Sequence, residues 1–229
     1  MEFRQLREGI RAALLVPKDI SWEIPLVLDE FALEVYGVSA EFNILTGDVT
    51  EMVKSLSGLV DHMQALDWDK DGDRLQAPFG SQYLLTFFGY YLLHQMCAGH
   101  SGADGDVVRL LMNVVALHPM VLDSPELHFV IDVRVALTHS NYHRFFQLKR
   151  VANPYQRSLM EAAVSRVRKA ALAAMARAYL QFPLDELVEV LDLLSLTECL
   201  EFLKNEAGIP AGQINLKDHV VSFRSQKKK

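Results

Sequence analysis

The sequence predicts an all-α protein, built as an array of stacked helical hairpins that is capped by a small unit with a β-hairpin. Three observations support this prediction. Apolar residues recur at helical spacing along most of the 229 residues. The helical patterns are joined by short connections, so neighbouring helices form antiparallel pairs. Only one stretch, close to the end of the sequence, carries short runs with the composition of strands.

Helix signals divide the first part of the chain. Pro25 begins the first helix, and Asp48 or Thr50 caps the second. Ser124-Pro125 combines a cap with proline at the first helical position, which marks the start of the fifth helix. A polar loop over 67–80 separates the second helix from the third. The five predicted helices cover about 25–45, 50–63, 82–97, 104–117 and 126–138.

The second part of the chain begins with a short sixth helix that follows Ser140-Asn141 and ends before Asn153-Pro154. The longest helical pattern comes next, over about 155–181. Two shorter helices follow, over 183–194 and 198–207, and Ser195 is placed to cap the latter.

Two β-like runs, at 214–216 and 219–223, come after these helices, with Lys217-Asp218 as the candidate turn. Helix, turn, helix and β-hairpin is the order of a winged helix. We therefore expect three regions, which are a helical-repeat domain over 1–182, a winged-helix unit over 183–223 and a basic tail over 224–229.

The composition is that of an ordinary soluble globular protein, with half of the residues apolar and 23% charged. No apolar run is long enough to cross a membrane, and the N-terminus lacks the apolar core of a signal peptide. Cys97 and Cys199 lie far apart, each in an apolar helical pattern. We expect reduced, buried thiols in a nuclear or cytosolic protein that does not bind membranes.

Charge is strongly segregated behind a net charge of −6. Residues 140–180 contain eight Lys and Arg and one acid, whereas residues 1–139 contain 9 basic and 20 acidic residues. Residues 181–212 are acidic again, and the last 17 residues carry five cations and one acid. Basic segments beside acidic ones indicate either internal ion pairing or contact with nucleic acid.

Residues 67–73 resemble the first half of a calcium-binding loop, with oxygen ligands at positions 1, 3 and 5 and glycine at position 6. The second half departs from that pattern. Arg74 stands where an apolar residue belongs, and Pro78 replaces the bidentate glutamate. We therefore expect an acidic, solvated loop.

His139 and His143 are four residues apart, a spacing that can hold zinc on one helix face. No glutamate follows His139, no third ligand is evident, and a cap at Ser140-Asn141 places His139 outside the helix. The motifs of nucleophilic catalysis and of phosphate or dinucleotide binding are absent from the sequence. We expect structural histidines, no metal, no cofactor and no enzymatic activity. A metal-dependent enzyme built on the histidine pair or the acidic loop is the alternative of another class.

The helix over 155–181 carries an apolar stripe, with Arg166, Lys169 and Arg177 on its outward half. Two interpretations of these basic residues stay open. They form a solvated face that pairs with the acidic 181–212 segment, or they contact a phosphate backbone. No exposed aromatic set accompanies the cations, so base-specific recognition is not indicated. The candidate nucleic-acid contacts are Arg144, Lys149, Arg150, Arg166, Lys169, Arg177, Lys217, Arg224, Lys227, Lys228 and Lys229.

The expected recognition helix of the winged unit is acidic, with Glu198, Glu201 and Glu206 against only Lys204. The phosphates that line a major groove repel a helix of this charge. We therefore expect the winged unit to dock to protein, while the cations of the wing and tail stay available to nucleic acid. The candidate partner contacts are Glu198, Glu201, His219, Val221 and Phe223.

Several segments resemble motifs of one protein family. Asn141-Tyr142-His143-Arg144-Phe145-Phe146 is similar to the N-Y-x-R-F-F signature of the Sac/GANP family. Residues 83–94 resemble the family's F-x-x-Y-x-L-L helix, residues 166–179 its V-R-x-x-A-L…A-Y helix, and residues 198–203 its E-x-x-x-F-L motif. The likeness covers roughly residues 25–225. Gly80-Ser81-Gln82 stands where the family has an acidic-Phe pair, as in a divergent member.

The resemblance implies a helical-repeat array capped by a winged helix, akin to the PCI domains of the proteasome lid, signalosome and initiation-factor assemblies. It implies a non-enzymatic scaffold that pairs, winged helix to winged helix, with a PCI-domain protein that also holds a small acidic Sem/DSS-type protein. Such complexes bind RNA or DNA and act in mRNA processing and export. The resemblance thus implies a nuclear location, with a cytoplasmic one also open.

Within the family signature, Tyr142, Phe145 and Phe146 are expected to pack in the core, which leaves Arg144 as the exposed residue. The alternative within interaction proteins is a small PCI-like subunit of the proteasome lid, signalosome or translation initiation factor.

Overall fold

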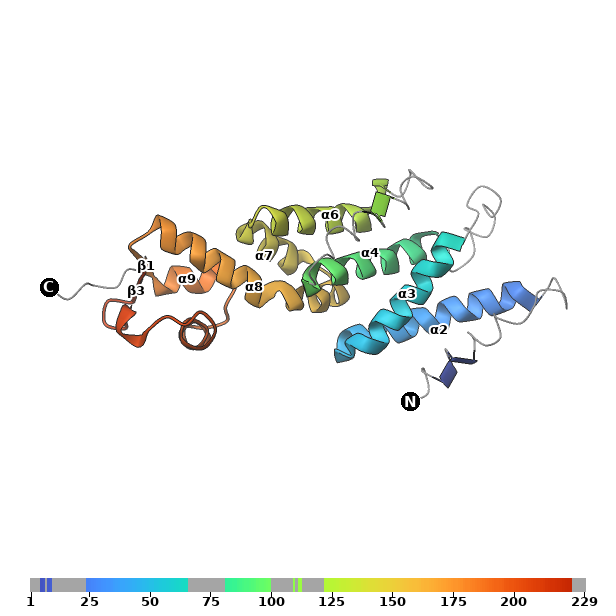
Figure 1. The fold of residues 1–229 in the computed structure, drawn as a ribbon, viewed down its shortest axis with the longest axis horizontal. Coiled ribbons are helices and arrows are strands. Elements are labelled where there is room, and N and C mark those ends of the chain that lie inside the picture. The colour runs from blue at the N-terminus through green and yellow to red at the C-terminus, as the bar shows by residue number, and fades with distance from the viewer. Residues whose placement is uncertain are drawn as a thin grey trace. The chain divides into compact units, whose positions relative to one another are not determined.

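The computed structural model describes residues 5–6, 8–9, 24–65, 81–99, 109, 111–112 and 122–223. These residues are mostly helical with a small antiparallel sheet near the end, which confirms the all-α prediction (Figure 1). The loop expected over 67–80, most of the helix expected over 104–117 and the tail over 224–229 lie outside the described residues. Packing divides the chain into two compact units, one of residues 1–131 with 152–160 and the other of 132–151 with 161–229.

The first unit is built on α2 (Ile24–Thr46), α3 (Val49–Ala65) and α4 (Ser81–Ala98), with the first turns of α6 (Pro125–Thr138). Gly47, at a φ of 76°, ends α2, and Asp48 Oδ1 begins α3 by accepting a hydrogen bond from Glu51 N at 3.1 Å. α2 packs on α3 and α3 on α4, as expected for stacked hairpins (Figure 1). The most deeply buried large side chains of these helices are Leu56, Leu59, Phe87, Phe88, Leu92 and Leu93.

The outward face of α2 keeps an apolar stripe exposed. Phe31, Val38, Phe42 and Leu45 are each between 45% and 57% exposed. At ~100° per residue, these four positions fall within a sector of about 60° around the helix axis. An apolar stripe of this spacing is one that a helix normally buries against another helix. The solvent-exposed face of α2 therefore resembles a face that packs against another helix.

The second unit contains α7 (Tyr142–Val151), most of α8 (Pro154–Ala178) and residues 181–223, which we call the C-terminal unit. Its elements follow in the order β1 (Gln181–Pro183), α9 (Leu184–Val190), α10 (Leu196–Glu201), β2 (Ile214–Asn215) and β3 (Val220–Ser222). The sheet is antiparallel, with β3 between β1 and β2. The core shared by α8 and the C-terminal unit includes Ala171, Leu172, Met175, Leu184, Leu187, Cys199, Leu203 and Val221.

Strand β1 differs from the sequence prediction, which continued the long helix to 181 and began the next at 183. The residue before a proline is driven out of the α region, and Phe182 precedes Pro183. Phe182 pairs with Val221 across β1 and β3, and its side chain is buried. Three residues are too few for a strand pattern that the sequence alone could reveal.

The end of the C-terminal unit also differs in detail. α10 continues into a wider helical turn over Phe202–Glu206, which ends at Gly208 with a φ of 67°. The hairpin turn spans 216–219 rather than Lys217-Asp218 alone. Asn215 fixes this longer turn, because its Oδ1 accepts hydrogen bonds from the backbone N of Lys217 and of Asp218, at 3.0 and 3.2 Å.

Candidate functional site

The family-like signature forms the start of α7. Asn141 caps the helix, because its Oδ1 accepts a hydrogen bond from Arg144 N at 3.0 Å. Phe145 and Phe146 are buried, with their rings edge to face at 5.5 Å. Tyr142 packs, partly buried, on the core of the second unit. These placements confirm that the aromatic residues of the signature are packing elements and that Arg144 is exposed, as are Asn141 and His143.

Arg168 of α8 holds the loop between α9 and α10. Its guanidinium donates to Leu191 O at 2.9 Å, to Asp192 O at 2.7 Å and to Glu198 Oε1 at 3.1 Å. The two carbonyls belong to Leu191 and Asp192, directly after α9, where backbone acceptors lack partners within the helix. One cation therefore satisfies the end of α9 and the carboxylate at the start of α10. Arg168 is not among the candidate contacts predicted from the sequence.

Four of the candidate nucleic-acid contacts pair with carboxylates of the second unit. The N–O pairs are Arg144–Asp132 at 2.5 Å, Lys149–Glu161 at 2.8 Å, Arg150–Asp192 at 2.8 Å and Lys169–Glu206 at 3.9 Å. Asp192 and Glu206 belong to the acidic 181–212 segment, so internal pairing accounts for part of the basic segment. Lys149 is the least accessible of the four cations, because only 13% of its side chain is exposed.

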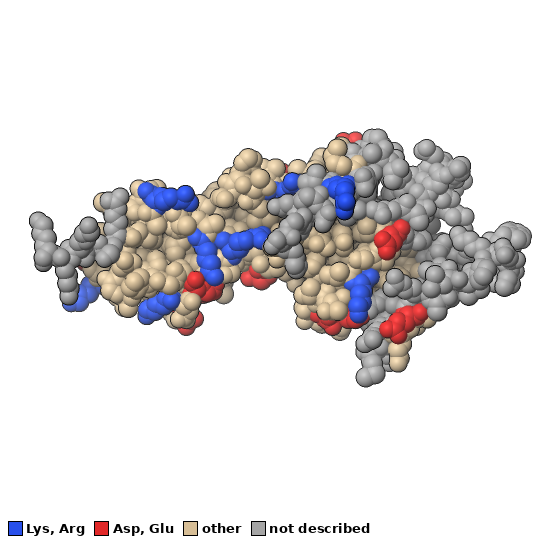
Figure 2. Space-filling model, in the orientation of Figure 1, with Lys and Arg blue, Asp and Glu red and all other residues tan. Residues whose placement is uncertain are grey.

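The other described candidates, Arg166, Arg177 and Lys217, are exposed, and Arg177 Nε donates to Ala173 O of its own helix at 3.2 Å. On the face drawn in Figure 2, Lys and Arg side chains stand in separate groups rather than in one continuous area. This distribution suits several single phosphate contacts better than one binding groove. The remaining candidates, Arg224, Lys227, Lys228 and Lys229, lie outside the described residues.

The candidate partner contacts fall into different environments. Glu201 and His219 are exposed, whereas Phe223 is partly buried against the core. Glu198 is partly exposed and already engaged within the unit, because its carboxylate accepts hydrogen bonds from Arg168 and from Leu194 N at 2.7 Å. Val221 is fully buried at the centre of β3, on the strand face that packs on the helices. Its side chain is therefore removed from the candidate partner contacts.

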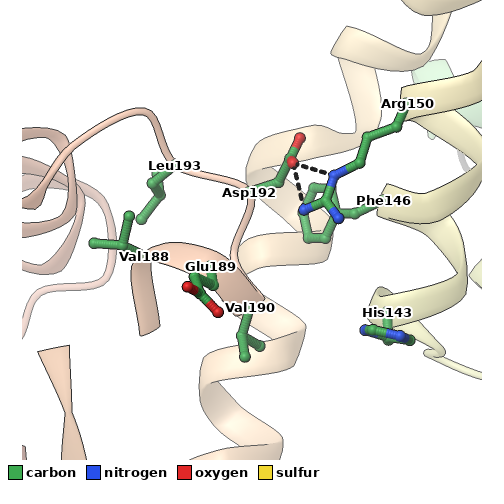
Figure 3. A pocket seen from close by; sticks show the side chains of 8 residues that line it. All are labelled: His143, Phe146, Arg150, Val188, Glu189, Val190, Asp192 and Leu193. Atoms are coloured by element: carbon green, nitrogen blue, oxygen red, sulfur yellow. Dashed lines mark hydrogen bonds and ion pairs between the residues drawn. The ribbon is translucent and has the colours of Figure 1, made fainter. Parts of the chain in front are cut away.

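A pocket of about 420 Å³ lies between α7 and the end of α9 (Figure 3). One wall comes from α7, with His143, Phe146 and Arg150, and the other from α9 and the loop after it. Arg150 and Asp192 join the two walls through an ion pair, in which Arg150 Nε donates to Asp192 Oδ1 at 2.9 Å. The second wall consists of Val188, Glu189, Val190, Asp192 and Leu193.

The reactive side chains of the second unit have structural surroundings. Burial, with a smaller contribution from the charge of Glu198, raises the pKa of the Cys199 thiol to about 11, so the thiol stays protonated near neutral pH. His139 lies in the turn before α7, as expected, and His143 Nε2 lies 2.9 Å from Gln147 Nε2. Across the described ranges, no group of three His, Cys, Asp or Glu could hold a metal ion. None of the described helices is both long and apolar enough to cross a membrane.

These features define a class of protein. It is a mainly α-helical protein whose C-terminal unit combines helices with a small sheet and carries exposed charged side chains. The chain belongs to the SAC3/GANP family, because the model of that family matches residues 50–209. The matched range contains all four segments that resemble family motifs, including the signature at the start of α7. Proteins of this family are non-catalytic scaffolds associated with mRNA export.

Proposed function

We propose that this chain is a non-enzymatic scaffold subunit of a nuclear complex in mRNA processing and export. In this proposal the C-terminal unit acts as a winged helix and pairs with a PCI-domain protein. That partner also holds a small acidic Sem/DSS-type protein. The observation that carries the proposal is the family match over residues 50–209. The order β1, α9, α10, β2, β3, with β3 in the middle of the sheet, supports the assignment of a winged helix.

The partner surface that we propose combines the edge strand β2 with the exposed side of α10. β2 lies at the edge of the sheet, and Leu216, directly after it, is more than half exposed. An edge strand beside an exposed apolar side chain is suited to strand addition by another protein. Glu201 adds a negative charge on α10, which favours a partner that brings basic side chains to this surface.

The pairing is tested with the double variant Leu216→Glu, Glu201→Arg in affinity purification of the tagged chain from cells. We expect the PCI-domain protein and the Sem/DSS-type protein to be lost together, while the melting temperature stays that of the parent chain. Val151→Glu is the control, because Val151 is also highly exposed but lies at the end of α7. Recovery of lid, signalosome or initiation-factor subunits with the parent chain would favour the alternative instead.

For nucleic acid, we propose contact with the phosphate backbone by the exposed cations Arg166, Arg177 and Lys217 together with those of the tail. Charge reversal of Arg224, Lys227, Lys228 and Lys229 should weaken RNA binding and flatten its salt dependence. Each lost phosphate contact lowers the slope of log K against log salt by roughly 0.7 for a single strand. An unchanged slope, measured by filter binding over a salt series, would reject the tail as a contact.

A further inference from the structure

The loop between α9 and α10 displays a leucine on a fixed backbone. Leu194 is 95% exposed. The backbone around it is nevertheless held by hydrogen bonds and an ion pair. Leu193 N donates to Val188 O at 2.9 Å, and Leu194 N donates to Glu198 Oε2 at 2.7 Å. The Arg168 guanidinium holds the carbonyl of Asp192, and Arg150 holds its carboxylate. An apolar side chain on a loop that is already ordered loses little conformational entropy when a partner covers it.

The pocket is lined by Leu193, the residue before Leu194, and its walls are partly apolar and partly polar, with one carboxylate outside the Arg150–Asp192 ion pair. Phe146 and Leu193 are buried at the pocket wall, and Val188 and Val190 are partly exposed. The charges of Arg150 and Asp192 offset each other. Glu189 is exposed, and no ion pair of its carboxylate is found among the described residues. In Figure 3 this carboxylate stands on the α9 wall, apart from the Arg150–Asp192 pair.

We infer that the pocket and Leu194 together dock an extended segment of another protein in which a bulky apolar side chain stands next to a lysine or arginine. The apolar side chain fills the space between Phe146, Val188 and Val190, and the cation pairs with Glu189. Leu194 packs on the aliphatic part of the same segment. A nucleic-acid strand or an acidic segment is disfavoured, because Glu189 repels its charge. This surface is formed by other residues than the β2 edge, so it does not depend on the pairing proposed above.

The test uses the full chain and a library of random short peptides displayed on phage. We expect enriched peptides that join a bulky apolar residue to Lys or Arg. Their synthetic, fluorescein-labelled forms should lose about tenfold or more in affinity against Glu189→Lys and against Leu194→Asp, as for central interface residues. Glu186→Lys is the matched control, because it makes the same charge change on an exposed residue of α9 outside the pocket. It should change affinity less than about threefold.

Any of four outcomes would overturn the inference. Acidic peptides, or no enrichment over a blank surface, would reject the stated chemistry. An equal loss with Glu186→Lys would assign the effect to the general charge of α9. Self-association of the chain that Leu194→Asp abolishes would assign the surface to a second copy. Melting curves of each variant, together with the isosteric Glu189→Gln, which should weaken binding without inverting the charge, separate these effects from misfolding.

Discussion

Single side chains that bridge elements hold the second unit together, and Arg168 is the clearest of them. Its guanidinium satisfies two carbonyls at the end of α9 and the carboxylate of Glu198. Helical periodicity cannot reveal these acceptors, which lie 23 to 30 residues further along the chain. By contrast, the caps at Asp48, Ser124, Asn141 and Ser195 are local and were predictable.

Arg168→Met should lower the free energy of unfolding by about 2–3 kcal/mol, because it leaves three partly buried hydrogen bonds without their donor. Urea denaturation measures this loss. Arg177→Met is the matched control on the same helix, since Arg177 is exposed and, within the described residues, bonds only to a carbonyl of its own helix. It should stay within about 0.5 kcal/mol of the parent chain. Equal losses in both variants would contradict the role given to Arg168.

The Cys199 thiol should resist alkylation in the folded protein. Its pKa is raised to about 11 by burial, so the reactive thiolate is scarce below that pH and grows as the pH rises toward it. In a Cys97→Ala background, iodoacetamide at neutral pH should label Cys199 only as fast as the protein unfolds. Rapid labelling of the native chain at neutral pH would show that the thiol is accessible.

At the scale of elements, a glycine sets how closely α2 approaches α4. A Cβ added to Gly37 would overlap Tyr83 Oη and lie 2.8 Å from Tyr83 Cζ, so the ring would have to move. Tyr83 also donates to Leu33 O and packs edge to face on Phe87. The contact between α2 and α4 therefore requires a residue without a side chain at position 37. Gly37 serves this contact although glycine weakens a helix interior by about 1 kcal/mol.

Gly37→Ala should destabilise the protein by about 1–3 kcal/mol, because overpacking outweighs the gain in helix propensity. Gly89→Ala is the control on α4, where the added Cβ meets only ordinary contacts at 3.5 Å or more. That variant should be neutral or stabilised by up to about 1 kcal/mol. Thermal and urea unfolding measure both. A destabilised Gly89→Ala with an unaffected Gly37→Ala would reverse this assignment.

The sequence predicted most helices because their signals are local, namely apolar spacing and caps. Pairings between distant segments were harder to predict. Strand β1 is three residues long and exists through its partner β3, so no local pattern marks it. The candidate site was predicted as a set of charges, but which cations pair internally depends on α7, α8 and the acidic segment packing together. The outward positions of Arg166, Lys169 and Arg177 followed from helical geometry alone.

At the scale of the whole molecule, charge is distributed so that basic and acidic segments of the second unit partly neutralise each other. The pairs made by the exposed cations Arg144, Arg150 and Lys169 contribute little to stability, about 0–1 kcal/mol each. Their carboxylates can therefore be replaced by other anions at small cost. These cations can therefore exchange their carboxylate partners for phosphates. Added salt weakens their pairing with carboxylates and with phosphates alike.

The exposed stripe of α2 has a consequence for how the purified chain behaves in solution. Because Phe31, Val38, Phe42 and Leu45 share one accessible face, concentrated protein should associate through this helix, and sulfate should promote association where chloride does not. Val38→Lys with Leu45→Lys should restore a monomer in sedimentation velocity at the same concentration. In the cell, the same property would make production of the chain dependent on the simultaneous supply of whatever covers α2.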